Sequence, residues 1–91
     1  MNQIAELLKK MAAALVDTPE AVAVVQNAPN EEGTTVFDVT IGQGELGQAL
    51  GKEGRLANAM RLVIKSAARK QNLGRVLVEF KDKDKDKETE P

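Results

Sequence analysis

Apolar and polar residues alternate with two different periods along the chain, and each period predicts a type of element. Between positions 2 and 16, apolar residues recur at three- and four-residue spacing, as expected for an amphipathic helix. They are Ile4, Leu7, Leu8, Met11 and Leu15. Asn2 is suited to cap this helix, and Asp17-Thr18-Pro19 is expected to end it, because a residue before proline disfavours helical backbone.

Three short segments rich in β-branched residues predict strands. The first is AVAVVQN at 21–27, and the second is TTVFDVTI at 34–41. Apolar and polar positions alternate along the second, so one of its faces is expected to be buried. The intervening APNEEG is typical of a turn, and the two strands are therefore predicted to pair as a hairpin. RVLVEF at 75–80 is the third strand, with its valines and Phe80 on one face.

Two further helices are predicted between the second and third strands. A short one fits residues 45–50, and a longer one runs from 55 to about 70. The longer segment carries an apolar stripe at a period of 3.6. The stripe consists of Leu56, Met60, Val63, Ile64 and Ala67. The opposite side of this helix is polar and carries Asn58, Arg61, Lys65 and Arg69.

The resulting order, α-β-β-α-α-β, predicts an α+β domain in which helices pack on one face of a three-stranded sheet. Residues 1–80 are expected to form this single domain. Residues 81–91, KDKDKDKETEP, contain no apolar side chain and are predicted to be a disordered charged tail.

The composition excludes most catalytic and metal chemistry. The 91 residues include no Cys, His, Tyr or Trp, so disulfides, thiolate metal sites and histidine catalysis are excluded. Ser66, the only serine, has no histidine to activate it. We therefore expect a binding protein rather than an enzyme, with no metal and no cofactor. No apolar run approaches the ~18 residues that cross a bilayer, and a cytoplasmic location without membrane contact is expected.

Positive charge is concentrated in one part of the chain, although the net charge is only −1. Residues 51–75 hold seven basic residues against one acidic residue, whereas residues 1–50 hold two basic and seven acidic residues. The local field, rather than the net charge, determines how strongly a polyanion is attracted. The segment 51–75 is therefore the candidate for contact with nucleic acid.

Five of the seven glycines lie in GQGELGQALGKEGR at 42–55, which contains two candidate binding motifs. The first, from Gly42 to Gly47, matches the G-x-G-x-x-G of dinucleotide-binding proteins. That motif needs a strand–helix–strand unit of about 30 residues, with an acidic residue about 20 positions further on. Here that position is an apolar residue in the middle of the long helix. The first glycines are therefore interpreted as a turn between strand and helix.

The second motif, Gly51-Lys52-Glu53-Gly54, links the two predicted helices and is followed by Arg55. Glycine lacks Cβ, so a sugar–phosphate chain can approach the backbone closely. The amides and the positive dipole end at the start of the long helix favour phosphate, and Lys52 and Arg55 add positive charge. The alternative interpretation is a purely structural turn between two helices.

The segment LGQALGKEGRLANAMRLVIKSAA, with the element order around it, resembles the core of KH domains in the bacterial type II arrangement. Together with ALVDTPEAVAV, it is similar to the small single-KH bacterial proteins of the KhpA family. The resemblance implies binding of about four nucleotides of single-stranded RNA. The residues expected to contact RNA are Gly51, Lys52, Glu53, Gly54 and Arg55 at the clamp, Leu50 and Leu46 beneath the bases, and Asn58 on the long helix.

Two residues depart from the pattern of that family. Gln48 stands where a basic residue is common, and Leu50 stands where Ile or Val is common. The first departure removes a positive charge, and Glu53 adds a negative charge inside the clamp, so both predict weak binding. The function implied is that of an RNA-chaperone-like protein or post-transcriptional regulator.

Leu62 interrupts the polar side of the long helix and marks a possible dimer interface with its neighbours Arg61 and Lys65. KhpA-like proteins are thought to pair with themselves and with a larger KH-containing RNA-binding protein. The resemblance therefore implies a homodimer, a heterodimer, or both. The alternative function is a protein-interaction module that acts through dimerisation and has a weak or vestigial RNA site.

Overall fold

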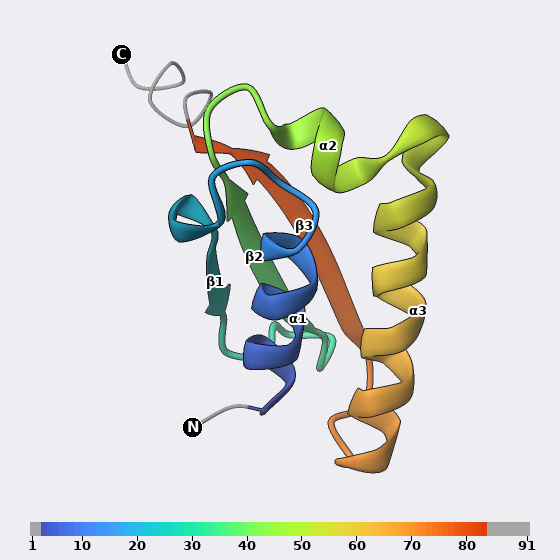
Figure 1. The fold of residues 1–91 in the computed structure, drawn as a ribbon. Helices are drawn as coiled ribbons and strands as arrows, with labels where there is room; N and C mark the ends of the chain where they lie inside the picture. The colour runs from blue at the N-terminus through green and yellow to red at the C-terminus, as the bar shows by residue number, and fades with distance from the viewer. Residues whose placement is uncertain (1–2, 84–91) are drawn as a thin grey trace.

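The computed structural model describes residues 3–83 and contains a three-stranded sheet with helices packed against it (Figure 1). Its elements are α1 (Gln3–Ala13), β1 (Ala23–Gln26), β2 (Thr35–Ile41), α2 (Leu46–Leu50), α3 (Arg55–Lys70) and β3 (Val76–Asp82). Short 3-10 turns, Pro19–Ala21 and Lys52–Gly54, precede β1 and α3. The predicted α+β class and the α-β-β-α-α-β order are confirmed.

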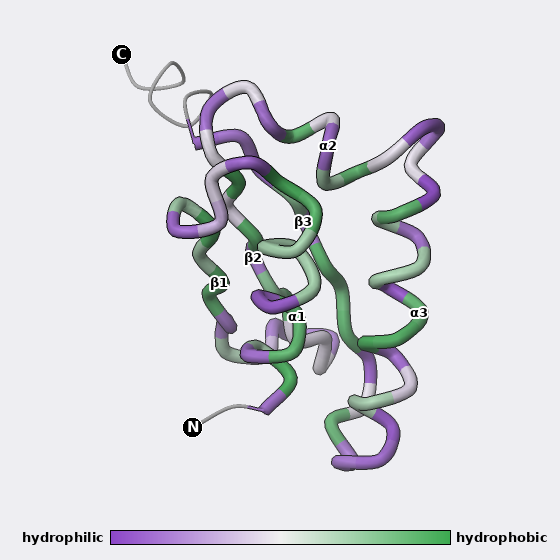
Figure 2. Tube along the Cα trace, in the orientation of Figure 1, coloured by the Kyte–Doolittle hydropathy of each residue, from purple (hydrophilic) through white to green (hydrophobic). Residues whose placement is uncertain are grey.

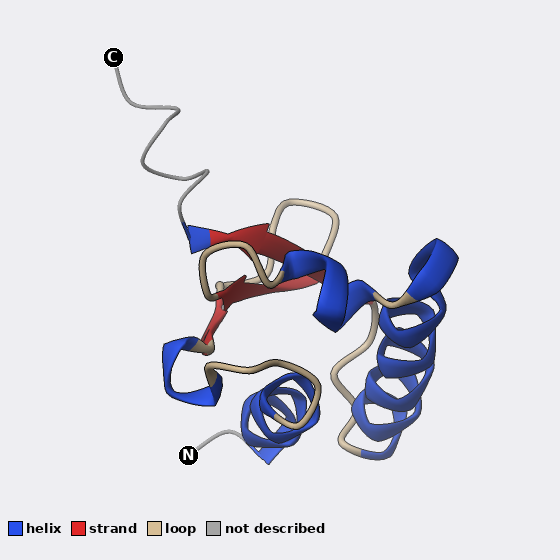
Figure 3. Ribbon diagram, turned by 45° about the horizontal axis from the view of Figure 1, so that its top comes forward, coloured by secondary structure: helices blue, strands red, loops and turns tan. Residues whose placement is uncertain are grey.

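The sheet is mixed, with the order β1-β2-β3. β1 and β2 are antiparallel, as the hairpin prediction required, whereas β2 and β3 are parallel. Parallel neighbours need a crossover connection, and α2 and α3 supply it. α1 and α3 lie on the same side of the sheet (Figure 3).

The core lies between the sheet and the two longer helices. β2 follows the predicted alternation, with Thr35, Phe37, Val39 and Ile41 all buried. α1 contributes three buried residues to the same cluster, and α3 contributes three more. Hydrophobic positions accordingly recur along these elements (Figure 2).

The buried face of α3 is rotated relative to the predicted stripe. Met60 and Ile64 are buried as expected, but Leu56 and Val63 remain 37% and 43% exposed. Ala57 and Ala68 are buried in addition. Small alanine side chains allow the helix to lie close to its neighbours, which is why the contact face includes them.

The ends of the predicted segments differ by a few residues. The first strand begins at Ala23 rather than at 21, because Pro19–Ala21 forms a 3-10 turn. β3 continues to Asp82, two residues beyond the predicted strand. Asn2 and most of the predicted tail (84–91) lie outside the described residues. Among residues 3–83, no helix is long and apolar enough to cross a membrane.

We predict that Phe37→Ala destabilises the domain by about 3–5 kcal/mol, because the ring is completely buried and its removal leaves a cavity. Val25→Ala is the control, since Val25 also lies in the sheet but is 55% exposed, and its cost is expected to be below about 1 kcal/mol. Urea denaturation followed by circular dichroism measures both. Equal losses of stability would contradict the position of the core.

Candidate nucleic-acid interface

A sharp turn joins α2 to α3, and it contains the Gly51-Lys52-Glu53-Gly54 motif. The amide of Gly51 donates to the carbonyl of Gly47 at 3.0 Å and ends α2. The amide of Gly54 then donates to the carbonyl of Gly51 at 3.1 Å and closes the 3-10 turn. The turn lies at the corner of the molecule where the two helices meet (Figure 1).

Gly51 is required at its position for two reasons. Its backbone has φ 77° and ψ 174°, a combination that essentially only glycine adopts. A Cβ at this position would also lie 2.6 Å from Cγ of Leu56. The side chain of Leu56 therefore packs directly against the bare Cα of Gly51.

Two further residues of the turn, Glu53 and Gly54, have left-handed backbone. Glu53 has φ 57° and Gly54 has φ 74°, and Glu53 is one of two described non-glycine residues with positive φ. Such a conformation costs of order 1 kcal/mol for a residue with a side chain. A Cβ on Gly54 would meet no heavy atom within 4 Å. The backbone is therefore open to an incoming chain at Gly54.

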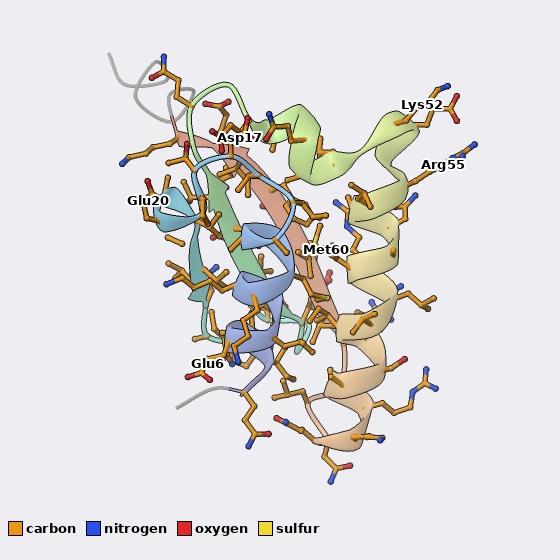
Figure 4. The ribbon with its side chains drawn as sticks, viewed as in Figure 1. Glu6, Asp17, Glu20, Lys52, Arg55 and Met60 are labelled. Carbon is orange, nitrogen blue, oxygen red and sulfur yellow. The ribbon has the colours of Figure 1, made fainter. Side chains whose placement is uncertain are left out.

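Charged side chains surround the turn without filling it. Lys52, Glu53 and Arg55 are exposed, and Lys52 and Arg55 project away from the domain (Figure 4). Arg55 lies 3.5 Å from the carboxylate of Glu53, and both side chains are largely exposed. The first turn of α3 receives no side-chain cap, because its N-cap residue is Gly54. The amides and dipole at this end of α3 thus lie beside two cationic side chains.

The first glycine cluster has a structural role at the β2–α2 connection. Gly42 is buried, and its carbonyl accepts a hydrogen bond from the amide of Glu45 at 3.0 Å. Gly44 has φ 78°, and its amide donates to the carboxylate of Asp82 at 3.2 Å. α2, which follows, has only five residues. This geometry is the strand-to-helix turn predicted for Gly42 and Gly44.

Four hydrogen bonds fix α2 to the loop after α1. The amide and hydroxyl of Thr18 donate to the carboxylate of Glu45 at 3.0 and 2.6 Å. The amide of Asp17 donates to Oε1 of Gln48, and Nε2 of Gln48 donates to the carboxylate of Asp17, both at 3.1 Å. Gln48 therefore anchors α2, and a basic residue in its place would lack the amide oxygen that Asp17 uses.

The remaining residues predicted to contact RNA lie on the helices beside the turn. Leu46 and Leu50 are half-buried on α2, and Leu46 packs against the core. Asn58 is exposed on α3, where its Oδ1 accepts a hydrogen bond from Arg61 at 3.3 Å. The structure therefore brings these three residues to the two helices that flank the turn.

Of the three residues predicted for a dimer interface, Arg61 and Lys65 line the same hollow, whereas Leu62 is exposed. Leu62 is 68% exposed. Arg61 lies against β3, since its Nε donates to the carbonyl of Val78 at 3.3 Å and its guanidinium sits 5.4 Å from the ring centre of Phe80. Lys65 lines a hollow between α3 and β3.

That hollow includes a residue the sequence reasoning did not single out, Arg75, which precedes β3. Its charge contributes to the basic segment 51–75, but charge counting does not say which side of the molecule it occupies. The parallel pairing of β3 with β2 places Arg75 beside the C-terminal part of α3. Arg75 could have been placed beside α3 only by predicting that the helices form a crossover connection between parallel strands.

The sheet order, the crossover helices and the glycine turn between them define a KH domain. The family model of the KhpA/KhpB KH domain matches residues 5–80. The chain belongs to this family, as its sequence resemblance suggested.

Curated relatives agree with the family assignment. The protein named RNA-binding protein KhpA from Caldanaerobacter subterraneus subsp. tengcongensis is 39% identical over 75 residues, which cover 82% of this chain and 96% of the relative. A protein of the same name from Clostridium acetobutylicum shows the same identity and coverage. A third, from Aquifex aeolicus, is 31% identical over 77% of this chain and 86% of its own length.

A solved structure supports the fold. Aquifex aeolicus Era bound to GDP and AlF4− matches with a TM-score of 0.59 at 18% identity. The match covers 87% of this chain and 29% of the Era chain. At this level of identity the likeness concerns the fold alone.

We predict that Gly51→Ala destabilises the domain by about 2–4 kcal/mol, whereas Gly54→Ala costs about 1 kcal/mol. Both glycines have positive φ, but only Gly51 would bring its new Cβ against Leu56. Urea denaturation measures the two losses, and adding Leu56→Ala to Gly51→Ala should recover part of the larger one. Equal costs for the two glycines would show that the contact with Leu56 is unimportant.

Proposed function

We propose that this chain binds single-stranded RNA, with phosphates at the Gly51–Gly54 turn and bases against α2. The observation that carries the proposal is the open, left-handed backbone of the turn, flanked by the exposed side chains of Lys52 and Arg55. The names of the curated KhpA relatives support RNA as the ligand. KH modules bind about four nucleotides through such a loop.

Phosphate binding at the turn combines several modest contributions. The dipole of α3 favours a negative charge near Gly54, and the two cations attract the RNA backbone. Glu53 opposes them, because its carboxylate repels phosphate and lies 3.5 Å from Arg55. The expected affinity is therefore weak and strongly dependent on salt, and the expected sequence preference is low.

The bases are expected to lie on the half-buried side chains of Leu46 and Leu50, with Asn58 available for a polar contact. None of these groups recognises a particular base strongly. Weak binding with little sequence preference suits an RNA-chaperone-like protein or a post-transcriptional regulator. In this proposal the protein acts in the cytoplasm and catalyses no reaction.

We predict that the double substitution Lys52→Asp/Glu53→Asp abolishes RNA binding without unfolding the domain. It replaces a cation at the clamp with an anion, and both side chains are exposed. Fluorescence anisotropy with a single-stranded RNA of twelve uridines measures the affinity. For the unsubstituted chain, log affinity should fall with log salt with a slope of about −0.7 per phosphate contact.

The control for this experiment is Glu6→Asp/Lys9→Asp, which makes the same change of charge on the exposed face of α1. Glu6 lies at the opposite end of the molecule from Lys52 (Figure 4). The control variant should keep the affinity within about threefold, since only the long-range field changes. Unchanged RNA affinity in the Lys52/Glu53 variant would remove the turn from the mechanism.

A second proposed function is self-association, or pairing with a larger KH-containing protein, through the outward side of α3. Three large apolar side chains on this helix remain exposed, namely Leu56, Leu62 and Val63. Leu62 is the most exposed of them, at 68%. Single exposed leucines are common, but Leu62 lies on the polar side of the helix, about 100° from Val63, so its exposure favours an interface there.

We predict that Leu62→Glu lowers the sedimentation-equilibrium mass from that of a dimer to that of a monomer. A carboxylate in a contact that buries position 62 is costly to desolvate, and the side chain of Leu62 makes little contact with the core. Leu62→Met is the control, because it keeps the apolar surface and should keep the mass. An unchanged mass in Leu62→Glu would show that Leu62 lies outside any interface.

A further inference from the structure

α2 is too short to hold its own position, and the glycine turn follows it directly. The helix has five residues, whereas isolated helices shorter than about 12–15 residues are marginal in water. Its one buried side chain is Ala49, which is small, and Leu46 packs against the core while remaining half-buried. Contacts with other elements must therefore fix where α2, and with it the start of the turn at Gly51, lies.

The loop after α1 supplies such contacts through two pairs of hydrogen bonds. Both oxygens of the Glu45 carboxylate accept from Thr18, one from its amide at 3.0 Å and one from its hydroxyl at 2.6 Å. Gln48 exchanges two hydrogen bonds with Asp17, both at 3.1 Å. Asp17 accordingly lies beside α2 (Figure 4). Residues three apart lie on the same side of a helix, so these four anchor bonds hold one side of α2 to one loop.

The anchor bonds affect the position of α2 more than the stability of the domain. The two bonds between Asp17 and Gln48 are exposed to solvent, so water can replace them at little cost to folding. Water does not, however, tie α2 to a fixed partner. Loss of these bonds is therefore expected to broaden the range of positions that α2 occupies while the core stays folded.

We infer that Asp17 and Thr18 are positioning residues for RNA binding, which act through Gln48 and Glu45. The inference rests on the proposed function, because α2 and the turn that follows it form the proposed RNA site. When α2 tilts or slides, the leucines expected beneath the bases and the glycine turn move with it. RNA that fits the native arrangement then binds more weakly, in proportion to the fraction of molecules that keep that arrangement.

The first test variant is Gln48→Leu, which removes both hydrogen bonds with Asp17 and changes no charge. Asn27→Leu is the matched control. Its side chain donates to the carbonyl of Val36 at 3.1 Å and to the carboxylate of Asp38 at 2.9 Å, so the control also loses two exposed hydrogen bonds. Asn27 lies where β2 begins, whereas α2 follows the other end of β2.

Fluorescence anisotropy with an RNA of twelve uridines measures the affinity of the full chain, and urea denaturation measures its stability. We expect Gln48→Leu to bind about five- to tenfold more weakly than the unsubstituted chain, and Asn27→Leu to bind within about twofold of it. The slope of log affinity against log salt should not change, because no phosphate contact is removed.

A second variant acts from a residue outside the proposed RNA contacts. Thr18→Val removes the hydroxyl that donates to Glu45 and keeps the shape of the side chain. It should weaken RNA binding about threefold, whereas Thr18→Ser keeps the hydroxyl and should bind as the unsubstituted chain does.

An exchange of groups separates positioning from a direct contact of position 48 with RNA. In Asp17→Asn/Gln48→Glu the side-chain donor and acceptor change places, so both hydrogen bonds can form and the net charge is unchanged. Gln48→Glu alone sets two carboxylates against each other and should bind about tenfold more weakly. Separate effects of the two positions on RNA add in a double-mutant cycle, whereas the anchor bonds couple them. Asp17→Asn should therefore recover affinity in the Gln48→Glu background by about threefold more than it changes affinity in the unsubstituted chain.

Amide hydrogen exchange at Gly51 gives a measurement that needs no RNA. This amide donates to the carbonyl of Gly47 at the end of α2, so Gln48→Leu should speed its exchange about fivefold.

The possible failures are distinguishable. If exchange at Gly51 is faster but RNA affinity is unchanged, the anchor bonds hold α2 without positioning the RNA site, and the inference is overturned. Equal affinity losses in Gln48→Leu and Asn27→Leu, or additive effects in the cycle, would overturn it as well, while the proposed function stands. If the unsubstituted chain binds no RNA, the proposed function fails, and the inference fails with it.

Discussion

The parallel pairing of β2 with β3 is the constraint on which the candidate site depends. Two parallel neighbours cannot be joined by a tight turn, so the chain must leave the end of β2 and return to the start of β3. α2 and α3 make this return, and the chain reverses direction between them at Gly51–Gly54. Because two helices make this connection, a turn has to join them. Because Gly51 and Gly54 lack a Cβ, a ligand can approach the backbone at this corner, between the exposed side chains of Lys52 and Arg55.

The Gly51–Gly54 turn contributes both to the stability of the domain and to the proposed binding. Different residues of the turn meet these two requirements. Gly51 is held by the contact with Leu56, whose side chain leaves no space for a Cβ. Gly54 meets no such neighbour, so the space above it is available to a ligand. Glu53 adopts a left-handed conformation that suits glycine or asparagine better, and its charge opposes phosphate. The turn is therefore not optimised for affinity, which agrees with the weak binding proposed.

Local patterns predicted the elements well, because helix and strand periods are properties of short segments. The alternation along β2 identified Phe37 and its buried partners, and the glycines at 51 and 54 identified the turn. Contacts between distant segments were not predictable in this way. The side chain of Gln48 donates a hydrogen bond to the carboxylate of Asp17, which is 31 residues away in the sequence, and no local pattern predicts that pairing. Arg61 likewise was predicted to lie on the polar side of the helix and in a possible dimer interface, whereas it donates to the carbonyl of Val78.

The two proposed activities of α3 are linked by their positions on the helix. Leu62 and Lys65 are three residues apart, so their side chains lie one turn apart on neighbouring parts of the surface. A second copy docked at Leu62 would approach Lys65, and its own Lys65 would approach in return. RNA phosphates bound along α3 would neutralise that repulsion. Under the two proposals, RNA binding therefore strengthens pairing, and by reciprocity pairing strengthens RNA binding.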